Sequence, residues 1–364
     1  MANSQRLLSL DILRGITVAG MILVNNGWGE SYDMLQHVEW NGMTPCDLVF
    51  PFFLYIVGIS CYLSLAKAEF KPTAQVICRI LRRTVLLFAI GLFIHWFDNA
   101  LAGDYGLAHL RIWAVLQRIA LCYCAVSLFA LYCNHRYTLP VAALLLVAYS
   151  VILIWGNGYA EDASVNVLAQ VDLRLFGYDR LYHNGPVDPE GLVGTISSIA
   201  HVLIGFYCGK LIRGKNTVER KVIGLFVIGT LLVIGGWLLS YGLPLNKRVW
   251  SPSYVMVTCG LASLLQALLM YVIDMDGSSK FYTRHPLLFA PFHVFGVNAI
   301  ALYVSSELLA IILGYYGVSY HIFYWIHAVV PPLKLASLVY ALYFVLLNFA
   351  IGYFLYRKKI YIKL

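Results

Sequence analysis

The sequence predicts an all-α, polytopic membrane protein with about ten transmembrane helices and both termini in the cytoplasm. The first observation is composition: of 364 residues, 60% are hydrophobic and 12% are charged, whereas soluble domains are about 45–50% apolar and about 25% charged. The second is a mean hydropathy of +0.75. The third is a series of long, continuous apolar runs, which indicate helices because membrane β-barrels show short alternating segments instead.

The apolar runs place these helices along the chain, since crossing a hydrocarbon core of about 30 Å takes roughly 20 helical residues. The expected spans are residues 8–27, 48–66, 79–97, 112–133, 138–156, 192–212, 221–242, 253–273, 287–313 and 335–356. Residues 1–364 are expected to form a single transmembrane domain, with 156–191 as its largest extracytoplasmic loop. The chain has no clear internal repeat, so the sequence gives no support to an inverted-repeat transporter.

The first run is expected to be a retained span. It carries Asp11 and Arg14, and the VNNGWG that ends it lacks the small-residue pattern of a signal-peptide cleavage site.

The distribution of charge predicts the orientation. With the N-terminus inside, 18 basic residues fall on the cytoplasmic side and six on the other, which satisfies the positive-inside rule. The 18 are Arg6, Lys67, Lys71, Arg79, Arg82, Arg83, Arg136, Lys210, Arg213, Lys215, Arg220, Lys221, Lys280, Arg284, Arg357, Lys358, Lys359 and Lys363. The six are Arg111, Arg174, Arg180, Lys247, Arg248 and Lys334. Membrane orientation therefore explains the net charge of +8, and no nucleic-acid partner is expected.

Neither the cysteines nor the histidines predict a metal site. Most of the eight cysteines lie in apolar runs, where cysteine behaves as a small hydrophobic residue, and no Cys-x-x-Cys pair occurs. The histidines at 95, 201, 293 and 327 lie near span ends or in apolar surroundings, where a structural role is commoner than a ligand role.

Charged residues inside the spans need partners, because a charge in the bilayer core costs at least a few kcal/mol. Asp11 and Arg14 share a helical face, and both an internal ion pair and a ligand role remain open. Arg118 should meet an acid or an anionic ligand, and Glu307 is a candidate acid. Asn298 and Ser305 are expected to form hydrogen bonds between helices.

The stretch QHVEWNGMTPCDLVFP at 36–51 is the most polar interval between two spans. His37 can exchange a proton near neutral pH, and Asp47 can fix its tautomer. Asn25 and Asn26, which end the preceding span, can either donate hydrogen bonds to an oxyanion or cap their helix.

The chain resembles the heparan-α-glucosaminide N-acetyltransferase family. The resemblance rests on SLDILRGITVAGMILVNN, HVEWNGMTPCDLVFPFFLYIVGIS, RIWAVLQRIALCY, VDPEGLVGTISSIAHVLIGFYCG and PLNKRVWSPSYV, which occur in the family's order over nearly the whole chain. The His-x-x-Trp-Asn-Gly and Asp-Pro-Glu-Gly-x-x-Gly-Thr elements are the most specific.

The resemblance implies transfer of an acetyl group from cytoplasmic acetyl-CoA to the amino group of a terminal glucosamine across the bilayer. It implies that His37 is catalytic and that Asn25, or Asn26 beside it, is the family's asparagine. The expectation is a bacterial inner-membrane form, because the animal enzymes' additional N-terminal lumenal domain is missing from this sequence. Its His37 loop would face the periplasm and its acceptor would be a small amino sugar or glycan fragment. A homodimer is a further implication.

CoA is polyanionic and would need a basic cytoplasmic entrance. The residues available for it are Arg79, Arg82, Arg83, Lys210 and Arg213, and Arg14 and Arg118 are expected to line a passage for the pantetheine arm. On the outer side, Asp188 and Glu190 either bind a protonated amino sugar or form a turn before the sixth span. Trp40 and Asn41 are expected to contact the sugar, although tryptophans at this depth commonly serve as interfacial anchors.

Two mechanisms and two other functions remain open at this stage. His37 can act as a general base, with Asp47 orienting it and Asn25 stabilising the oxyanion, or it can carry the acetyl group itself. The alternative functions are an amino-sugar transporter and an O-acyltransferase that acts on an exported glycan.

Overall fold

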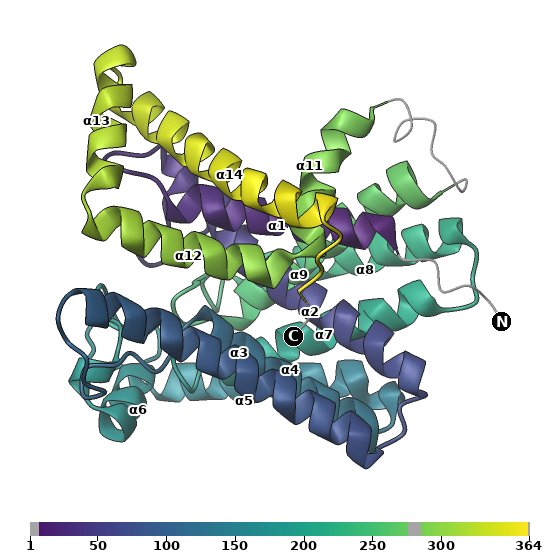
Figure 1. Cartoon of the computed structure of the whole chain (residues 1–364). Helices are drawn as coiled ribbons and strands as arrows, with labels where there is room; N and C mark the ends of the chain where they lie inside the picture. Colours follow the sequence, from purple (N-terminus) through teal and green to yellow (C-terminus); the bar gives the residue numbers. More distant parts are fainter. Residues whose placement is uncertain (1–6, 276–284, 363–364) are drawn as a thin grey trace.

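The computed structural model describes residues 7–275 and 285–362, and this part of the chain is helical without strands. The helices are α1 (Leu8–Asn25), α2 (Val49–Leu65), α3 (Ala74–Leu101), α4 (Val115–Tyr132), α5 (Thr138–Trp155), α6 (Val167–Phe176), α7 (Thr195–Arg213), α8 (Val218–Leu239), α9 (Pro252–Leu269), α11 (Pro286–Val297), α12 (Ala299–Tyr315), α13 (Val318–Val329) and α14 (Leu333–Arg357). Most of the long helices run side by side, while the shorter α6 and α13 lie at the same end of the bundle, on the left of Figure 1.

The described residues confirm an all-α, polytopic membrane protein. Eight of their helices are long and apolar enough to cross a membrane, or up to nine if α11 and α12 form one broken span. The span predicted at 79–97 lies in α3, which is 28 residues long and is not one of the eight. The prediction of about ten spans is therefore higher than the number found.

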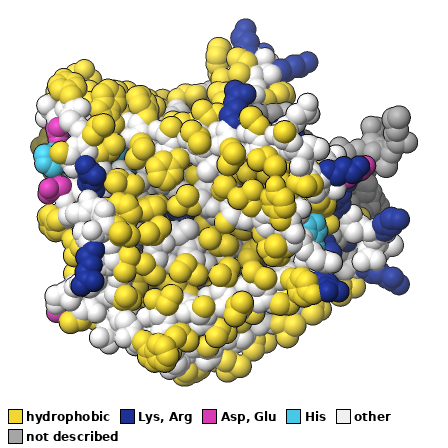
Figure 2. Space-filling view, turned by 90° about the horizontal axis from the view of Figure 1, so that it is seen from below, with side chains coloured by type: hydrophobic (Ala, Val, Ile, Leu, Met, Phe, Trp, Pro, Cys, Tyr) yellow, Lys and Arg dark blue, Asp and Glu magenta, His cyan; other side chains and the backbone are white. Residues whose placement is uncertain are grey.

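The surface seen in Figure 2 agrees with a molecule that crosses a bilayer. Hydrophobic side chains cover its middle, most Asp and Glu side chains lie at the left edge, and most Lys and Arg side chains lie at the right and upper edges. The orientation of the termini stays a prediction. Of the residues used for it, Arg6, Lys280, Arg284 and Lys363 lie outside the described residues.

The span predicted at 287–313 is not one continuous helix, because the chain bends by 83° between α11 and α12. Asn298 leaves the helical conformation at the bend, with φ −119° and ψ 36°. Its side chain binds the C-terminal tail: Nδ2 donates to the Ile360 carbonyl at 3.0 Å, and Oδ1 accepts from the Ile362 amide at 2.9 Å. Ser305 lies on an apolar groove beside Ile362.

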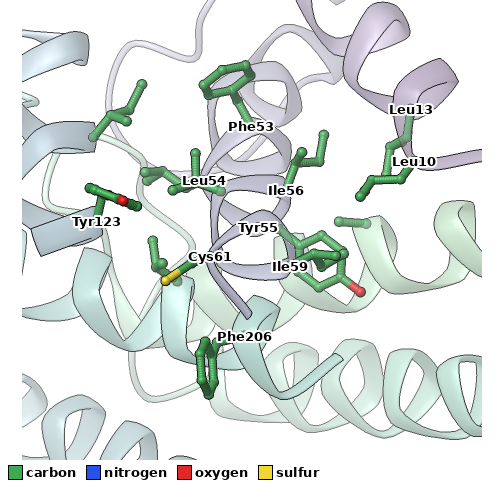
Figure 3. Packing of buried hydrophobic residues seen from close by; sticks show 14 of the residues in the cluster. Leu10, Leu13, Phe53, Leu54, Tyr55, Ile56, Ile59, Cys61, Tyr123 and Phe206 are labelled. Carbon is green, nitrogen blue, oxygen red and sulfur yellow. The ribbon is translucent and has the colours of Figure 1, made fainter. Parts of the chain in front are cut away.

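The core surrounds α2, which is apolar on all sides and therefore buried. Figure 3 shows Leu54, Tyr55, Ile56, Ile59 and Cys61 of this helix projecting in different directions, towards residues of three other helices. Those residues are Leu10 and Leu13 of α1, Tyr123 of α4 and Phe206 of α7. This central helix begins at the stretch that carries His37 and Asp47, so the core holds one wall of the candidate site.

Close backbone contacts fix the neighbouring helices. A Cβ atom on Gly205 of α7 would lie 2.2 Å from the Tyr55 carbonyl oxygen of α2, and one on Gly15 of α1 would lie 1.7 Å from the Phe292 carbonyl oxygen of α11. Small residues at such contacts are a general device of membrane helix packing, since they let two backbones approach.

We predict that Gly205→Ala destabilises the protein, because the added methyl group forces α2 and α7 apart; overpacking of this kind costs roughly 1–3 kcal/mol. The measurement is the apparent melting temperature in detergent. Gly314→Ala in α12 is the matched control, since its methyl group would meet nothing within 4 Å. Equal melting temperatures for the two variants would contradict the close packing.

Candidate active site

The loop between α1 and α2 is held by a buried turn and by a second loop. Thr44 and Asp47 form a reciprocal capping box at the short helix Pro45–Leu48, with Pro45 in its first turn. The Gly42 amide donates to the Leu245 carbonyl at 2.7 Å, and Asn246 Nδ2 donates to Asn41 Oδ1 at 3.2 Å. The loop is therefore fixed against residues about 200 positions later in the chain.

His37 and Asp47 form the pair that the sequence predicts. His37 Nδ1 lies 2.7 Å from Asp47 Oδ1, and the side chains are 48% and 1% exposed. The second Asp47 oxygen accepts from the Thr44 amide and hydroxyl, both at 3.1 Å. When the carboxylate accepts a hydrogen bond from Nδ1–H, the proton of a neutral imidazole stays on Nδ1 and Nε2 is the basic nitrogen.

Lys247 completes a cluster that sequence analysis missed. Its Nζ lies 3.3 Å from Asp47 Oδ1 and 3.0 and 3.2 Å from the two ring nitrogens of His37. Cys46 Sγ, which is buried, also lies 3.0 Å from His37 Nδ1. Lys247 looked like an ordinary loop lysine, and its only sequence signal was its place in PLNKRVW.

His37 and Lys247 border a cavity of about 340 Å³. Its walls come from the α1–α2 loop, α1, α3, α4, α12 and the outer loops. The lining residues are Asn25, His37, Val38, Gly91, Ile94, His95, Arg111, Ala114, Val115, Leu116, Gln117, Tyr182, Pro189, Glu190, Lys247, Arg248, Tyr303 and Glu307. This volume falls at the lower end of the range usual for small-molecule sites, about 300–1,000 Å³.

The two asparagines at the end of α1 differ in position. Asn25 lines the cavity, and its Nδ2 donates to Glu307 Oε1 at 3.3 Å. Asn26 is buried and donates to the Ile22 carbonyl at 2.8 Å. Asn25 is thus placed to meet a ligand, whereas Asn26 satisfies the last turn of its own helix.

Asp188 and Glu190 are both bound to Arg111, at 3.0 and 2.9 Å. Asp188 is buried and also accepts from the backbone amides of Tyr182 and Glu190, so it builds the turn. Glu190 faces the cavity and shares Arg111 with Asp188. Of the two acids expected to contact a sugar, the structure brings only Glu190 to the cavity.

The predicted contact of Arg118 with Glu307 is not formed. Arg118 is 1% exposed, donates to the Gly191 carbonyl at 3.0 Å and lies over the Trp250 ring. Arg14 pairs with Asp11 at 3.1 Å and donates to Ser60 Oγ at 3.0 Å. Neither arginine lines the cavity, and each is bound to other parts of the protein.

Trp40 and Asn41 support the loop instead of facing the cavity. Trp40 is buried, and its indole nitrogen donates to the Tyr159 carbonyl at 3.0 Å. Asn41 accepts from Asn246, as described above. Both side chains hold the part of the loop that follows His37.

The basic residues expected at a CoA entrance lie away from the cavity. Arg79, Arg82 and Arg213 are exposed, and Lys210 is half-buried. Arg83 lies over the Tyr123 ring. On α3, Arg79 precedes the cavity residue Gly91 by about 18 Å of helix, so the basic group and the cavity occupy different depths.

In residues 7–275 and 285–362, no three His, Cys, Asp or Glu side chains lie close enough together to hold a metal ion. The side chains at the cavity include a base, carboxylates, an ammonium group and an amide.

Comparison with known proteins shows the family of this chain. The profile described as heparan-alpha-glucosaminide N-acetyltransferase, catalytic, matches residues 6–243. The chain belongs to this family. The human heparan-alpha-glucosaminide N-acetyltransferase is 28% identical, over 99% of this chain and 60% of its own length. The mouse protein of the same name is 26% identical, over 100% of this chain and 61% of its own length.

The chain thus spans about 60% of the length of these relatives of the N-acetyltransferase family. The profile covers His37, Asp47 and Asn25, whereas Lys247 and Glu307 lie beyond its last matched residue. The tertiary structure is what brings those two side chains to the cavity that His37 borders.

Asp172 of α6 is a buried acid outside the membrane spans. It is 1% exposed, and its Oδ1 accepts from the Leu192 amide at 3.1 Å. Burial raises the pKa of its carboxyl group to about 6, although the Leu192 hydrogen bond opposes the shift. A folded-state pKa above the usual value means that the folded state prefers the protonated acid.

We predict that the protein loses stability as the pH rises from about 4 to about 6, because the folded state holds a proton there that the unfolded state has released. The loss is at most about 3 kcal/mol. Asp172→Asn should remove this dependence, as measured by melting temperature against pH. Asp179→Asn, an exposed acid of the same loop, is the control and should keep the wild-type curve.

Proposed function

We propose that this chain transfers an acetyl group from cytoplasmic acetyl-CoA to the amino group of an extracytoplasmic glucosamine or glucosamine-terminated glycan. The observation that carries the proposal is the His37–Asp47 pair at the cavity, in a chain that belongs to the N-acetyltransferase family. The bacterial inner membrane is the proposed location, with the His37 loop on the periplasmic side, and the proposed assembly is a homodimer.

The separation of charges supports a donor from the cytoplasmic side. The five basic residues proposed to receive the CoA phosphates are Arg79, Arg82, Arg83, Lys210 and Arg213. A phosphate needs such charge-assisted contacts because it cannot enter hydrocarbon unaided. The thioester would then reach the cavity, while the amino sugar would arrive from the opposite side.

In the proposed reaction, His37 Nε2 takes a proton from the sugar ammonium or amine. The amine nitrogen attacks the thioester carbonyl, the new C–N bond forms, and the C–S bond breaks. The nitrogen loses two protons when the substrate is the ammonium form. One of them ends on the CoA thiolate, and the other is released to solvent. Asp47 stabilises the charged imidazole, and Asn25 is the proposed hydrogen-bond donor to the oxyanion.

Lys247 is proposed to hold His37 and Asp47 in register. Its ammonium group lies within 3.3 Å of both side chains, so it opposes rotation of the imidazole away from the carboxylate. Direct transfer requires no covalent intermediate, whereas an acetyl-histidine would form on the same ring. Acetylated enzyme that accumulates without sugar would identify the second route.

The decisive experiment is incubation of the purified protein with labelled acetyl-CoA and a panel of glucosamine compounds. We predict that His37→Ala lowers kcat by about 10²–10⁴-fold, the usual contribution of a general base. His109→Ala is the matched control, since His109 forms an exposed pair with Asp104 and does not line the cavity.

Three outcomes would contradict the proposal. A fully active His37→Ala would exclude the assigned base. Glucosamine uptake into liposomes without acetyl-CoA would indicate a transporter, and labelling of a hydroxyl in place of the amine would indicate an O-acyltransferase.

For Lys247→Met we predict a fall in kcat of roughly 10- to 100-fold, as expected when a charge-assisted hydrogen bond is lost. The KM for acetyl-CoA should not change, and Lys247→Arg should recover part of the rate. Lys334→Met removes an exposed outer lysine and serves as the control. If kcat falls by the same factor in Lys247→Met and in Lys247→Arg, a positioning role that depends on charge is contradicted.

A further inference from the structure

The three carboxylates at or beside the cavity have different partners. Asp47 is bound to Lys247, and Glu190 is bound to Arg111. Glu307 makes no ion pair with any basic side chain of the described residues. Its neighbours are neutral: Asn25 Nδ2 donates to it at 3.3 Å, and the Tyr303 hydroxyl is its second hydrogen-bonding partner.

An acid without a cation is costly in this position. Glu307 lies within α12, the second arm of the broken span, and charged groups in such helices usually pair with one another or mark a ligand path. Asn25 and Tyr303 solvate the carboxylate, but they bring no positive charge. The cavity is the open space that Glu307 lines, so a compensating cation can come from there.

The charges around the cavity specify where a cationic ligand can bind. Arg111, Lys247 and Arg248 line it with positive charge, and Glu190 is bound to Arg111, which it shares with Asp188. The α12 wall, with Glu307, is the attractive side. Asn25 connects this wall to α1, at the same cavity that His37 borders.

We propose that Glu307 is the group that receives the ammonium of the acceptor and thereby selects an amine over a hydroxyl. This inference rests on the proposed function, whose acceptor is an amino sugar. Glucosamine arrives largely protonated near neutral pH, and a carboxylate binds the charged form through charge-assisted hydrogen bonds. The proton that must leave before attack goes to His37, so Glu307 is a binding residue and not the base.

A hydroxyl acceptor is neutral and needs no carboxylate to bind a positive charge. Glucose matches glucosamine in size and carries a hydroxyl in place of the amine. The hydroxyl can donate a hydrogen bond to Glu307 but brings no positive charge, so it does not compensate the carboxylate as an ammonium group does.

The test compares wild type, Glu307→Gln and Glu39→Gln, using glucosamine and glucose as ligands. Glu39 is an exposed acid of the His37 loop that does not line the cavity, so its variant makes the same charge change elsewhere. For Glu307→Gln we expect the KM for glucosamine to rise about tenfold or more, with the KM for acetyl-CoA unchanged. A wild-type KM for glucosamine in this variant would overturn the inference.

Binding without acetyl-CoA separates this inference from the proposed function. By calorimetry, wild type should bind glucosamine more tightly than glucose, and Glu307→Gln should lose this preference even if no acetyl transfer occurs. Acetyl transfer with an unchanged preference would uphold the function and overturn the role of Glu307.

If Glu307→Gln does not fold, Glu307→Asp decides the question. It keeps the charge but shortens the side chain, so glucosamine binding should weaken while glucose binding stays constant. Parallel changes for both sugars would overturn the inference.

Discussion

The Asp47 carboxylate is 1% exposed and joins segments that lie far apart in the sequence. It binds His37 and Thr44 in its own loop and Lys247 in the loop before α9, while its backbone carbonyl accepts from the Tyr254 hydroxyl at 2.5 Å. Burying a carboxylate is costly unless hydrogen bonds and opposite charge compensate it. The three side-chain partners provide that compensation, and the arrangement of the cavity rim depends on them.

The surrounding helices place this cluster at one end of the bundle. The apolar core fixes α2, whose first residues follow Asp47, and the close contact of Gly15 with Phe292 fixes α1 against α11. The end of α1 then carries Asn25 to the cavity, and the 83° bend after α11 directs α12 so that Glu307 meets it. Packing at positions without functional groups therefore determines which polar groups face one another.

The acids at this site differ in whether they have a basic partner. Arg111 is bound to both Asp188 and Glu190, and Lys247 is bound to Asp47, which makes these pairs part of the wall. Glu307 has neutral partners, and the half-exposed His37 borders the same cavity, with Lys247 Nζ 3.2 Å from its Nε2. A site that binds and then deprotonates a cation needs both an acid without a basic partner and a base.

The sequence by itself determined the all-α membrane class, the place of most spans and the His37–Asp47 pair, because these follow from apolar run length and from residues ten positions apart. The family resemblance extended this to the expected activity. The bend at Asn298, the burial of Trp40 and the approach of Lys247 to His37 were decided by the tertiary structure. Contacts between residues 210 positions apart depend on how the helices pack, and a local pattern carries no information about which distant side chain completes a site.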